Sequence, residues 1–400
     1  MKKNEKHTVL TYKILYTCII LFGYLVGRGL PLYGIDTAEY LGRTLDAQTI
    51  LMQTVSGDKY RYSVLALGIS PYMIASILVQ VFLALRNSES KSKISPKKMN
   101  RISLGITLVL AVIQAVVHVG ELKFAVVGET LILAKIVATV EMVTGAFIIL
   151  WLAERNKKYG IGGQTALILV NILDGLLSTI YGHSVKSLVV PLVISFVVMM
   201  VMLVMENTEL RIPVQRISIH NIYADKNYMA FKLNPIGIMP VILSSAFFML
   251  PQLAVTVLHW LLPENASIRY CMENFNLSRP LGIGIYIAMI YLLTIGFSIV
   301  FLSPRDLTEQ FLKSGDSILN LHAGKDTKRY LTKKLIQLGF LSATVMGICL
   351  GVPLILQMSG RIDSTLVMLP SSVMILTGIW GNLYQEIEAV KNYDAYQPFI

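Results

Sequence analysis

The sequence predicts an all-α, polytopic membrane protein with ten transmembrane helices in two pseudo-symmetric halves, 1–187 and 188–400. Hydrophobic residues make up 54% of the 400 residues and charged residues only 15%, against about 25% in soluble domains. Apolar runs of about 20 residues recur, and each can cross a hydrocarbon core about 30 Å thick. Two of these runs, the second in each half, are interrupted near their start by glycine and proline.

The ten apolar runs follow one another along the whole chain. Their approximate limits are 14–33, 64–85, 102–120, 130–152, 164–182, 188–205, 236–258, 282–302, 335–357 and 366–385. If the N-terminus is cytoplasmic, the segments on that side hold 25 Lys and Arg residues, against 8 on the other side. Cytoplasmic loops carry the excess of positive charge, so both termini are expected in the cytoplasm. The net charge of +11 then follows from topology, and no soluble basic domain is left to bind nucleic acid.

The two interrupted runs indicate an inverted repeat. The first contains Gly68 and Pro71, and the second contains Gly237 and Pro240. Interrupted spans at matching positions of two halves are typical of a functional site that lies between the halves. No residue-level repeat is detected, so this pairing depends on the pattern alone.

Pro71 suits the first turn of a helix, and Ser70 suits its N-cap. A helix from Pro71 to Leu85 has only 15 residues, about 22 Å at 1.5 Å per residue, which is too short to cross the membrane. The chain before it is therefore expected to enter the membrane without helical structure. Such backbone is tolerated only where it is buried in protein or lines a water-filled cavity. The alternative is an ordinary proline-kinked helix.

Two longer segments on the cytoplasmic side are expected to form structure of their own. Segment 206–235 alternates apolar and polar residues, and its stretch "RIPVQRISI" predicts a short strand in a projecting hairpin. Segment 303–334 predicts a helix, a glycine-marked turn and a second helix. Both segments suit the docking of a soluble partner. The alternative is that their positive charge only sets the orientation of the chain in the membrane.

No motif of an enzyme is present. The chain lacks H-E-x-x-H, a P-loop and G-x-S-x-G, and its three cysteines have no metal-binding spacing, so neither catalysis nor a metal or cofactor is expected. Three ionisable residues, Lys135, Glu141 and Asp174, lie within or near the ends of spans. Ion-coupled transport usually needs more ionisable residues within the membrane than these three. A pore is therefore favoured over an inverted-repeat secondary transporter, and an intramembrane enzyme is the third alternative.

Seven stretches resemble, in chain order, the SecY/Sec61-alpha family of protein-conducting channels. They are "PLYGID" (31–36), "SVLALGISPYMIASILVQ" (63–80), "TGAFIILWLAERNKKYGIGGQTALIL" (144–169), "RIPVQ" (211–215), "KLNPIGIMPVILSS" (232–245), "SPRDLTEQFLKSG" (303–315) and "GKDTKRYLTKKL" (324–335). The resemblance implies an hourglass channel in the cytoplasmic membrane. Its two halves would clamp around a central pore, and the pore would open sideways to lipid between spans 2/3 and 7/8.

The resemblance also implies roles for particular residues. An apolar ring would seal the pore around a passing chain, and its members would be Ile69, Met73, Leu169, Leu173, Ile242 and Ile375. Large aliphatic side chains form a constriction that sheds water. The segment 49–60 would be a plug in the outer funnel, with Thr49, Ile50, Leu51, Met52 and Val55. Polar residues at the side opening would be Ser76, Gln114, Ser244 and Ser245.

The resemblance further implies partners. A cytosolic ATPase motor would dock on the two longer segments, through Arg211, Arg216, Arg305, Lys313, His322 and Lys325. A small SecE-like subunit would clamp the halves, and a secretory polypeptide would be the substrate.

Two departures from the family pattern indicate a subtype. The family usually has an arginine in a Gly-Ile-Arg-Pro-Gly-like run, whereas this chain has "NLHAG" with His322 at that place. Segment 206–235 also lacks the usual basic cluster. These departures resemble the accessory type of Gram-positive bacteria, which works with a dedicated SecA-type motor and accessory secretion proteins to export serine-rich glycosylated adhesins. A housekeeping channel is the alternative.

Overall fold

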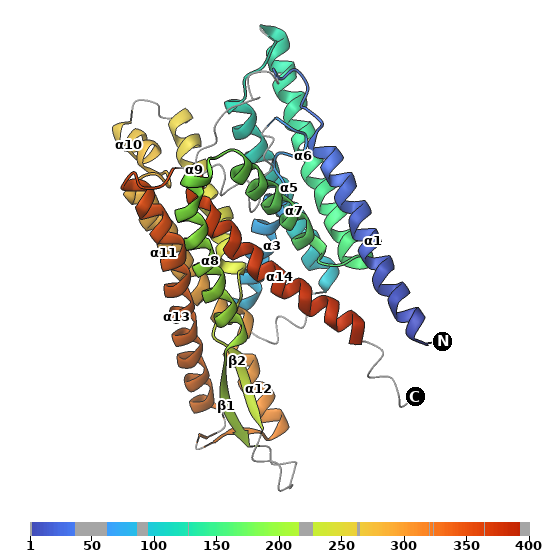
Figure 1. The fold of residues 1–400 in the computed structure, drawn as a ribbon, viewed down its shortest axis with the longest axis vertical. Helices are drawn as coiled ribbons and strands as arrows, with labels where there is room; N and C mark the ends of the chain where they lie inside the picture. Colours follow the sequence, from blue (N-terminus) through green and yellow to red (C-terminus); the bar gives the residue numbers. More distant parts are fainter. Residues whose placement is uncertain are drawn as a thin grey trace.

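The chain is described here by a computed structural model covering residues 2–36, 62–85, 95–126, 128–215, 227–261, 265–319, 321–322, 324–363 and 365–392. Each of the ten predicted spans corresponds to a helix (Figure 1). These helices are α1 (Lys2–Arg28), α3 (Ser70–Leu85), α5 (Pro96–Glu121), α6 (Glu129–Tyr159), α7 (Gly163–Tyr181), α8 (Val185–Asn207), α9 (Met239–Leu261), α11 (Pro280–Leu302), α13 (Lys325–Met358) and α14 (Leu369–Asn392).

In the described part of the chain, eight helices are long and apolar enough to cross a membrane. The helices α3 and α9 occupy the two remaining predicted positions, and both begin at a break in the backbone. A short helix, α10 (Ala266–Asn274), and a 3-10 turn, η3 (Leu366–Met368), were not predicted. The helices α1, α5, α6 and α7 lie on one side of the molecule and α9, α11 and α13 on the other (Figure 1).

The breaks before α3 and α9 have the same construction. Gly68 and Gly237 both have positive φ, +58° and +66°, a conformation that favours glycine. Each glycine opens the sequence Gly-Ile-x-Pro, which runs into the first turn of the helix. A match of four residues is too short to establish a repeat from the sequence alone. The shared positive φ of the two glycines shows that the two breaks are equivalent.

The predicted N-cap at Ser70 is wrong. The helix α3 includes Ser70, and the carbonyl that accepts the first helical bond belongs to Ile69, from Met73 N–H at 3.1 Å. The first span also ends earlier than predicted, at Arg28. Residues 29–36 are not helical, in keeping with the glycines and the proline that follow Arg28. The predicted plug, 49–60, lies outside the described residues.

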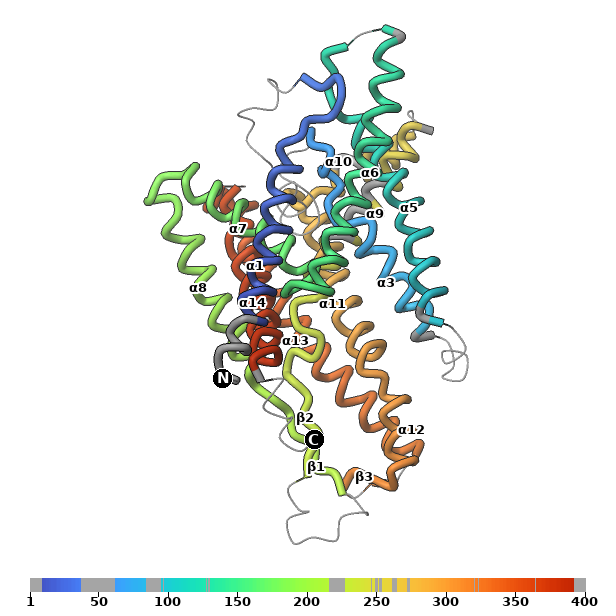
Figure 2. The backbone as a smooth tube through the Cα atoms, turned by 90° about the vertical axis from the view of Figure 1, so that its right-hand side faces the viewer, coloured from blue at the N-terminus to red at the C-terminus, as the bar shows by residue number. Residues whose placement is uncertain are grey.

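Segments 206–235 and 303–334 fold against each other. Strands β1 (Glu209–Gln215) and β2 (Tyr228–Lys232) pair antiparallel as the predicted hairpin, and β3 (Ser317–Ile318) adds to the other edge of β1. The helix α12 (Pro304–Ser314) and the first turns of α13 complete the unit. Its own apolar core consists of Ile212, Phe231, Ile318, Leu331, Leu335 and Leu338. We call this unit the platform, and it projects from one end of the helices (Figure 2).

Candidate functional site

The breaks before α3 and α9 lead into one central apolar cluster. Ile69 and Met73 from α3 and its break, Ile242 from α9 and Ile375 from α14 are all buried in it, and Leu169 of α7 packs against it. Both halves of the chain therefore contribute to the cluster. Five of the six predicted ring residues are brought together in this way.

Leu173 is the sixth predicted ring residue, and it is 41% exposed and not among the cluster residues. Its neighbour Ile172 is fully buried in the cluster instead. Ile168 and Ile172 are four residues apart and share one face of α7. Leu169 and Leu173 have the same spacing, so the sequence alone could not show which of the two pairs faces the cluster.

The helices predicted to flank the side opening contact each other across the two halves: α3 contacts α9 and α11, and α5 contacts α9. The three serines there bond within their own helices: Ser76 Oγ to the Met73 carbonyl, Ser244 Oγ to the Val241 carbonyl and Ser245 Oγ to the Ile242 carbonyl, at 2.7–2.9 Å. None of these bonds crosses between the halves. Ser244 and Ser245 are buried, whereas Ser76 lines a cavity.

That cavity has a volume of about 290 Å³ and lies between the two interrupted helices. The α3 side supplies Met73, Ser76, Ile77 and Gln80, and α7 supplies Gln164. The side formed by α9, its break and α11 is apolar, with Pro235, Ile236, Met239, Leu243 and Phe301. An apolar peptide segment placed in this cavity could therefore contact apolar side chains on one side and amide or hydroxyl groups on the other.

Gln114 of α5 differs from the serines. It is only 3% exposed, and neither its amide nitrogen nor its oxygen has a hydrogen-bond partner among the residues that the structure describes. A buried, unpaired amide costs about 1–3 kcal/mol. This cost weakens the packing of α5 in the arrangement seen here.

Replacing Gln114 by Met is therefore expected to stabilise the protein by about 1 kcal/mol or more. Methionine has a similar volume and brings no polar group that needs a partner. Thermal unfolding of the purified protein measures the change, with Gln337→Met on the exposed face of α13 as the control. A lower unfolding temperature for Gln114→Met would contradict this account.

Two of the ionisable residues predicted within the spans, Asp174 and Glu141, have partners in the structure. Arg28 is 3% exposed, and its Nη2 atom lies 3.0 Å from Asp174 Oδ2. One turn earlier, the Tyr24 hydroxyl donates to Asn171 Oδ1 at 2.8 Å. These contacts tie α1 to α7, and the Asp174 side chain is 39% exposed. Glu141 accepts a hydrogen bond from Tyr33 N–H at 2.9 Å.

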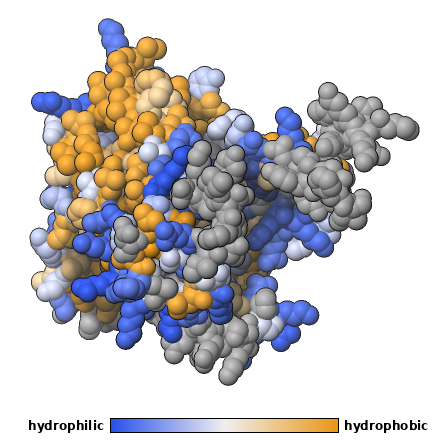
Figure 3. All heavy atoms as spheres, turned by 90° about the horizontal axis from the view of Figure 1, so that it is seen from below, coloured by the Kyte–Doolittle hydropathy of each residue, from blue (hydrophilic) through white to orange (hydrophobic). Residues whose placement is uncertain are grey.

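The platform carries most of the predicted docking residues on its surface. Arg211 of β1 lies over the Tyr228 ring at 4.6 Å from its centroid, and Arg305 lies 3.5 Å from Glu309. Lys313, His322 and Lys325 are exposed, and Arg216 lies outside the described residues. Seen from this end, hydrophilic residues gather over much of the face (Figure 3).

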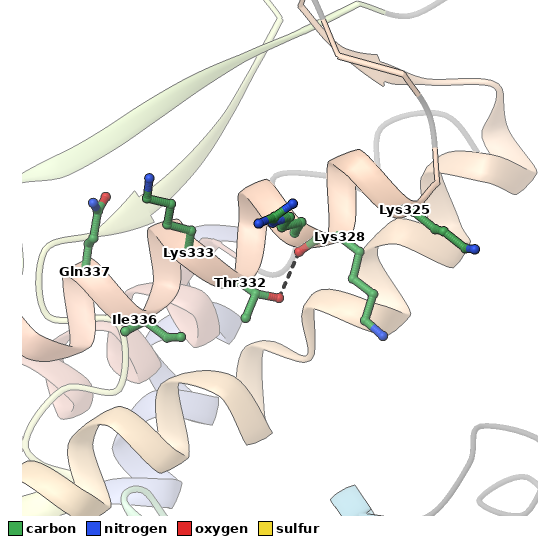
Figure 4. Close-up of a pocket in the computed structure, with 7 residues that line it drawn as sticks. Lys325, Lys328, Thr332, Lys333, Ile336 and Gln337 are labelled. Carbon is green, nitrogen blue, oxygen red and sulfur yellow. Dashed lines mark hydrogen bonds between the residues drawn. The ribbon is translucent and has the colours of Figure 1, made fainter.

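A basic stripe on α13 extends this surface. Lys325, Lys328, Arg329 and Lys333 recur at helical spacing with Thr332, Ile336 and Gln337, and they border an open groove (Figure 4). Only Lys325 was predicted to take part in docking. The others could have been found from their i, i+3, i+4 spacing, which puts them on one face.

Comparisons with known proteins agree with this arrangement. The SecY family model matches residues 63–384. Among curated relatives, the accessory Sec system protein translocase subunit SecY2 of Leuconostoc gelidum subsp. gasicomitatum is 28% identical over 414 residues, which cover 98% of both chains. The protein of the same name from Streptococcus agalactiae is 30% identical and covers 97% of this chain and 95% of its own.

Two solved structures share the fold. One is described as a protein conducting channel, with a TM-score of 0.68 and 16% identity over 98% of this chain and 95% of the other. The other is Sec61 in the canine ribosome-channel complex, with a TM-score of 0.64 and 18% identity over 98% and 95%. The family model covers most of the chain, and the chain has the fold of these channels. The chain belongs to the SecY family.

Proposed function

We propose that the chain is the pore subunit of an accessory Sec system, and that it conducts secretory polypeptides across the cytoplasmic membrane. The observation that carries this proposal is the central apolar cluster, to which both interrupted helices contribute. Ile69, at the break before α3, and Ile242, in the first turn of α9, are both buried in it. Aliphatic side chains offer no specific hydrogen bonds, so they can close around any sequence while shedding water.

The relatives support the accessory type, because those named here are SecY2 subunits that match this chain over almost its whole length. The substrate class that follows is large, serine-rich glycosylated adhesins. Further partners would be a SecE-like subunit that holds the halves 1–187 and 188–400 together, and accessory secretion proteins. Both termini would be cytoplasmic.

The platform is the proposed docking site for a dedicated SecA-type motor. It presents Arg211, Arg305, Lys313, His322 and Lys325 on a small unit with its own apolar core. The basic stripe on α13 adds Lys328, Arg329 and Lys333, so the matching surface of the motor would be acidic. Hydrolysis of ATP would belong to that partner, and this chain would act as the conduit.

A secondary transporter is the rival from another class. It would require an ionisable residue that binds a coupling ion or proton. Asp174 is paired with Arg28, and Glu141 accepts a backbone hydrogen bond, so both have structural roles that need no coupling. The channel predicts that export tolerates neutral substitutions at Glu141 that keep a hydrogen-bond acceptor.

Site-specific crosslinking in membranes tests the proposal. A photoreactive side chain is placed in turn at Ile69, Leu173, Ile242 and Ile375, and a secretory chain is stalled during export. Val197, exposed on α8, is the control. We expect crosslinks from Ile69, Ile242 and Ile375 to the stalled chain and none from Val197. Leu173 then decides whether the ring extends beyond the buried cluster.

The absence of crosslinks at all four positions, with the secretory chain shown to be engaged, would refute the channel. Crosslinks from Val197 as strong as those from the ring positions would refute the placement of the ring.

A further inference from the structure

Two non-helical pieces of chain pair with each other beside α6. Leu32 N–H donates to the Tyr62 carbonyl at 2.8 Å, and Val64 N–H donates to the Leu30 carbonyl at 3.0 Å. The bonds form an antiparallel bridge between Pro31 and Ser63. We call the two pieces, 30–36 and 62–64, the stem. The stem joins the chain that leaves α1 to the chain that leads into α3.

One backbone N–H of the stem has a side chain as its partner. On the far side of the stem, Ala125 N–H donates to the Gly34 carbonyl at 2.9 Å, and Ile35 forms a bridge with Phe124. Leu32 N–H and the Gly34 carbonyl therefore have backbone partners. Tyr33 N–H, which lies between them in sequence, donates to Glu141 Oε2 at 2.9 Å.

The stem lies along one face of α6. A Cβ atom at Gly34 would lie 3.3 Å from the Ala134 side chain, and a Cβ atom at Gly145 would lie 2.0 Å from the Val64 carbonyl oxygen. Ala134, Glu141 and Gly145 are 7 and 4 residues apart, so at about 100° per residue they share a face. Two small residues thus let the stem approach closely, and Glu141 supplies the polar contact between them.

We propose that Glu141 is a positioning residue. Its carboxylate accepts the backbone hydrogen bond that a carbonyl of a neighbouring strand would otherwise accept, and so holds the stem against α6. Glu141 lies in the middle third of α6, and its bond with Tyr33 is exposed at the surface of the chain. Where such a surface meets hydrocarbon, an unpaired backbone N–H is not tolerated. An ionisable residue in the middle of a span is costly and is usually kept for a function. That function is to accept the hydrogen bond from Tyr33 N–H.

The position of the stem controls the seal of the resting channel. Val64 is followed directly by Leu65 and then, through the break, by Ile69, and both Leu65 and Ile69 are buried in the central cluster. A stem that moves away from α6 pulls this short connection with it. Loss of the Glu141 contact therefore loosens the apolar cluster and lets ions leak. The effect on the seal rests on the proposed function as a channel.

The test compares two substitutions of Glu141 in the full chain, purified and reconstituted in vesicles. Glu141→Gln keeps an oxygen that can accept the bond, whereas Glu141→Met has a similar length and no such acceptor. Glu154→Met, at an exposed position of the same helix, is the control. Hydrogen exchange of a peptide that contains Tyr33 reports on the bond, and an enclosed ion-sensitive dye reports on the leak.

We expect Glu141→Met to raise exchange at Tyr33 about tenfold, the effect of losing one hydrogen bond of ordinary strength, and to raise the resting leak severalfold. Glu141→Gln and Glu154→Met should behave like the unmodified chain in both measurements. If Glu141→Met gives no folded protein, Tyr33→Pro removes the donor instead, and it should raise the leak in the same way.

Three results would overturn the proposal. Unchanged hydrogen exchange at Tyr33 in Glu141→Met would show that Glu141 does not hold the Tyr33 N–H. A Glu141→Gln protein as leaky as Glu141→Met would show that charge, and not the acceptor, is required. Faster exchange at Tyr33 without an ion leak would show that the position of the stem does not control the seal of the channel. Hydrogen exchange does not depend on export, so failure of the crosslinking test would refute the channel and leave the stem contact to be judged independently.

Discussion

Replacing Gly145 by Ala is expected to destabilise the protein by about 3 kcal/mol and to reduce export strongly. The added Cβ would lie 2.0 Å from the Val64 carbonyl oxygen and 2.8 Å from its carbon, so a backbone must move. Overpacking of a tight core costs about 1–3 kcal/mol and sometimes more, and a backbone atom yields less readily than a side chain. Thermal unfolding and export of a secretory chain measure the two effects.

Gly296→Ala is the matched control, because no atom of the residues that the structure describes lies within 4 Å of a Cβ at that position of α11. Alanine is also the better helix former by about 1 kcal/mol, so Gly296→Ala should be as stable as the unmodified chain or more so. If the two alanine variants unfold at the same temperature, the close contact between α6 and the chain before α3 is not as described.

Replacing Asp174 by Leu is expected to cost about 1–2 kcal/mol of stability. The change removes the carboxylate 3.0 Å from the Arg28 guanidinium, which is 3% exposed, whereas Asp174 itself is 39% exposed. Removing one partner of a fully buried ion pair costs about 3–5 kcal/mol, and solvent at Asp174 reduces that cost. Replacing both partners by apolar residues is often neutral. The double variant Arg28→Met, Asp174→Leu should therefore recover most of the loss in a thermal unfolding measurement.

The same pair separates the channel from an ion-coupled transporter. A channel in which the double variant folds should still export its substrate, because the pair only ties α1 to α7. Loss of export in a double variant with recovered stability would contradict the structural role of Asp174.

The spans could be predicted because each depends on local composition. All ten apolar runs became helices, and the glycines and prolines at the two breaks marked where α3 and α9 begin. The end of the first span was missed, since Leu30 and Leu32 read as apolar although Gly29 and Pro31 break the helix. The strand β3 was missed because two residues carry no periodic signal.

The contacts of the candidate site could be predicted only in part. The pairing of Arg28 with Asp174 joins residues 146 apart, and one sequence holds no information on which helices are neighbours. The partner of Glu141 is a backbone N–H, which any residue at position 33 other than proline supplies. The burial of Ile172 in place of Leu173 depends on the rotation of α7, which packing against its neighbours sets.

The helix α13 gives the platform a continuous connection to the central apolar cluster, in which Met346 and Leu350 of this helix are buried. It runs without interruption from Lys325 in the platform to Val352, ahead of Pro353, a length of about 41 Å at 1.5 Å per residue. A rod of that length acts as a lever arm. A tilt of about 5° imposed at the platform would displace its far end by about 4 Å, so a movement of the platform would be carried along α13 to the central apolar cluster.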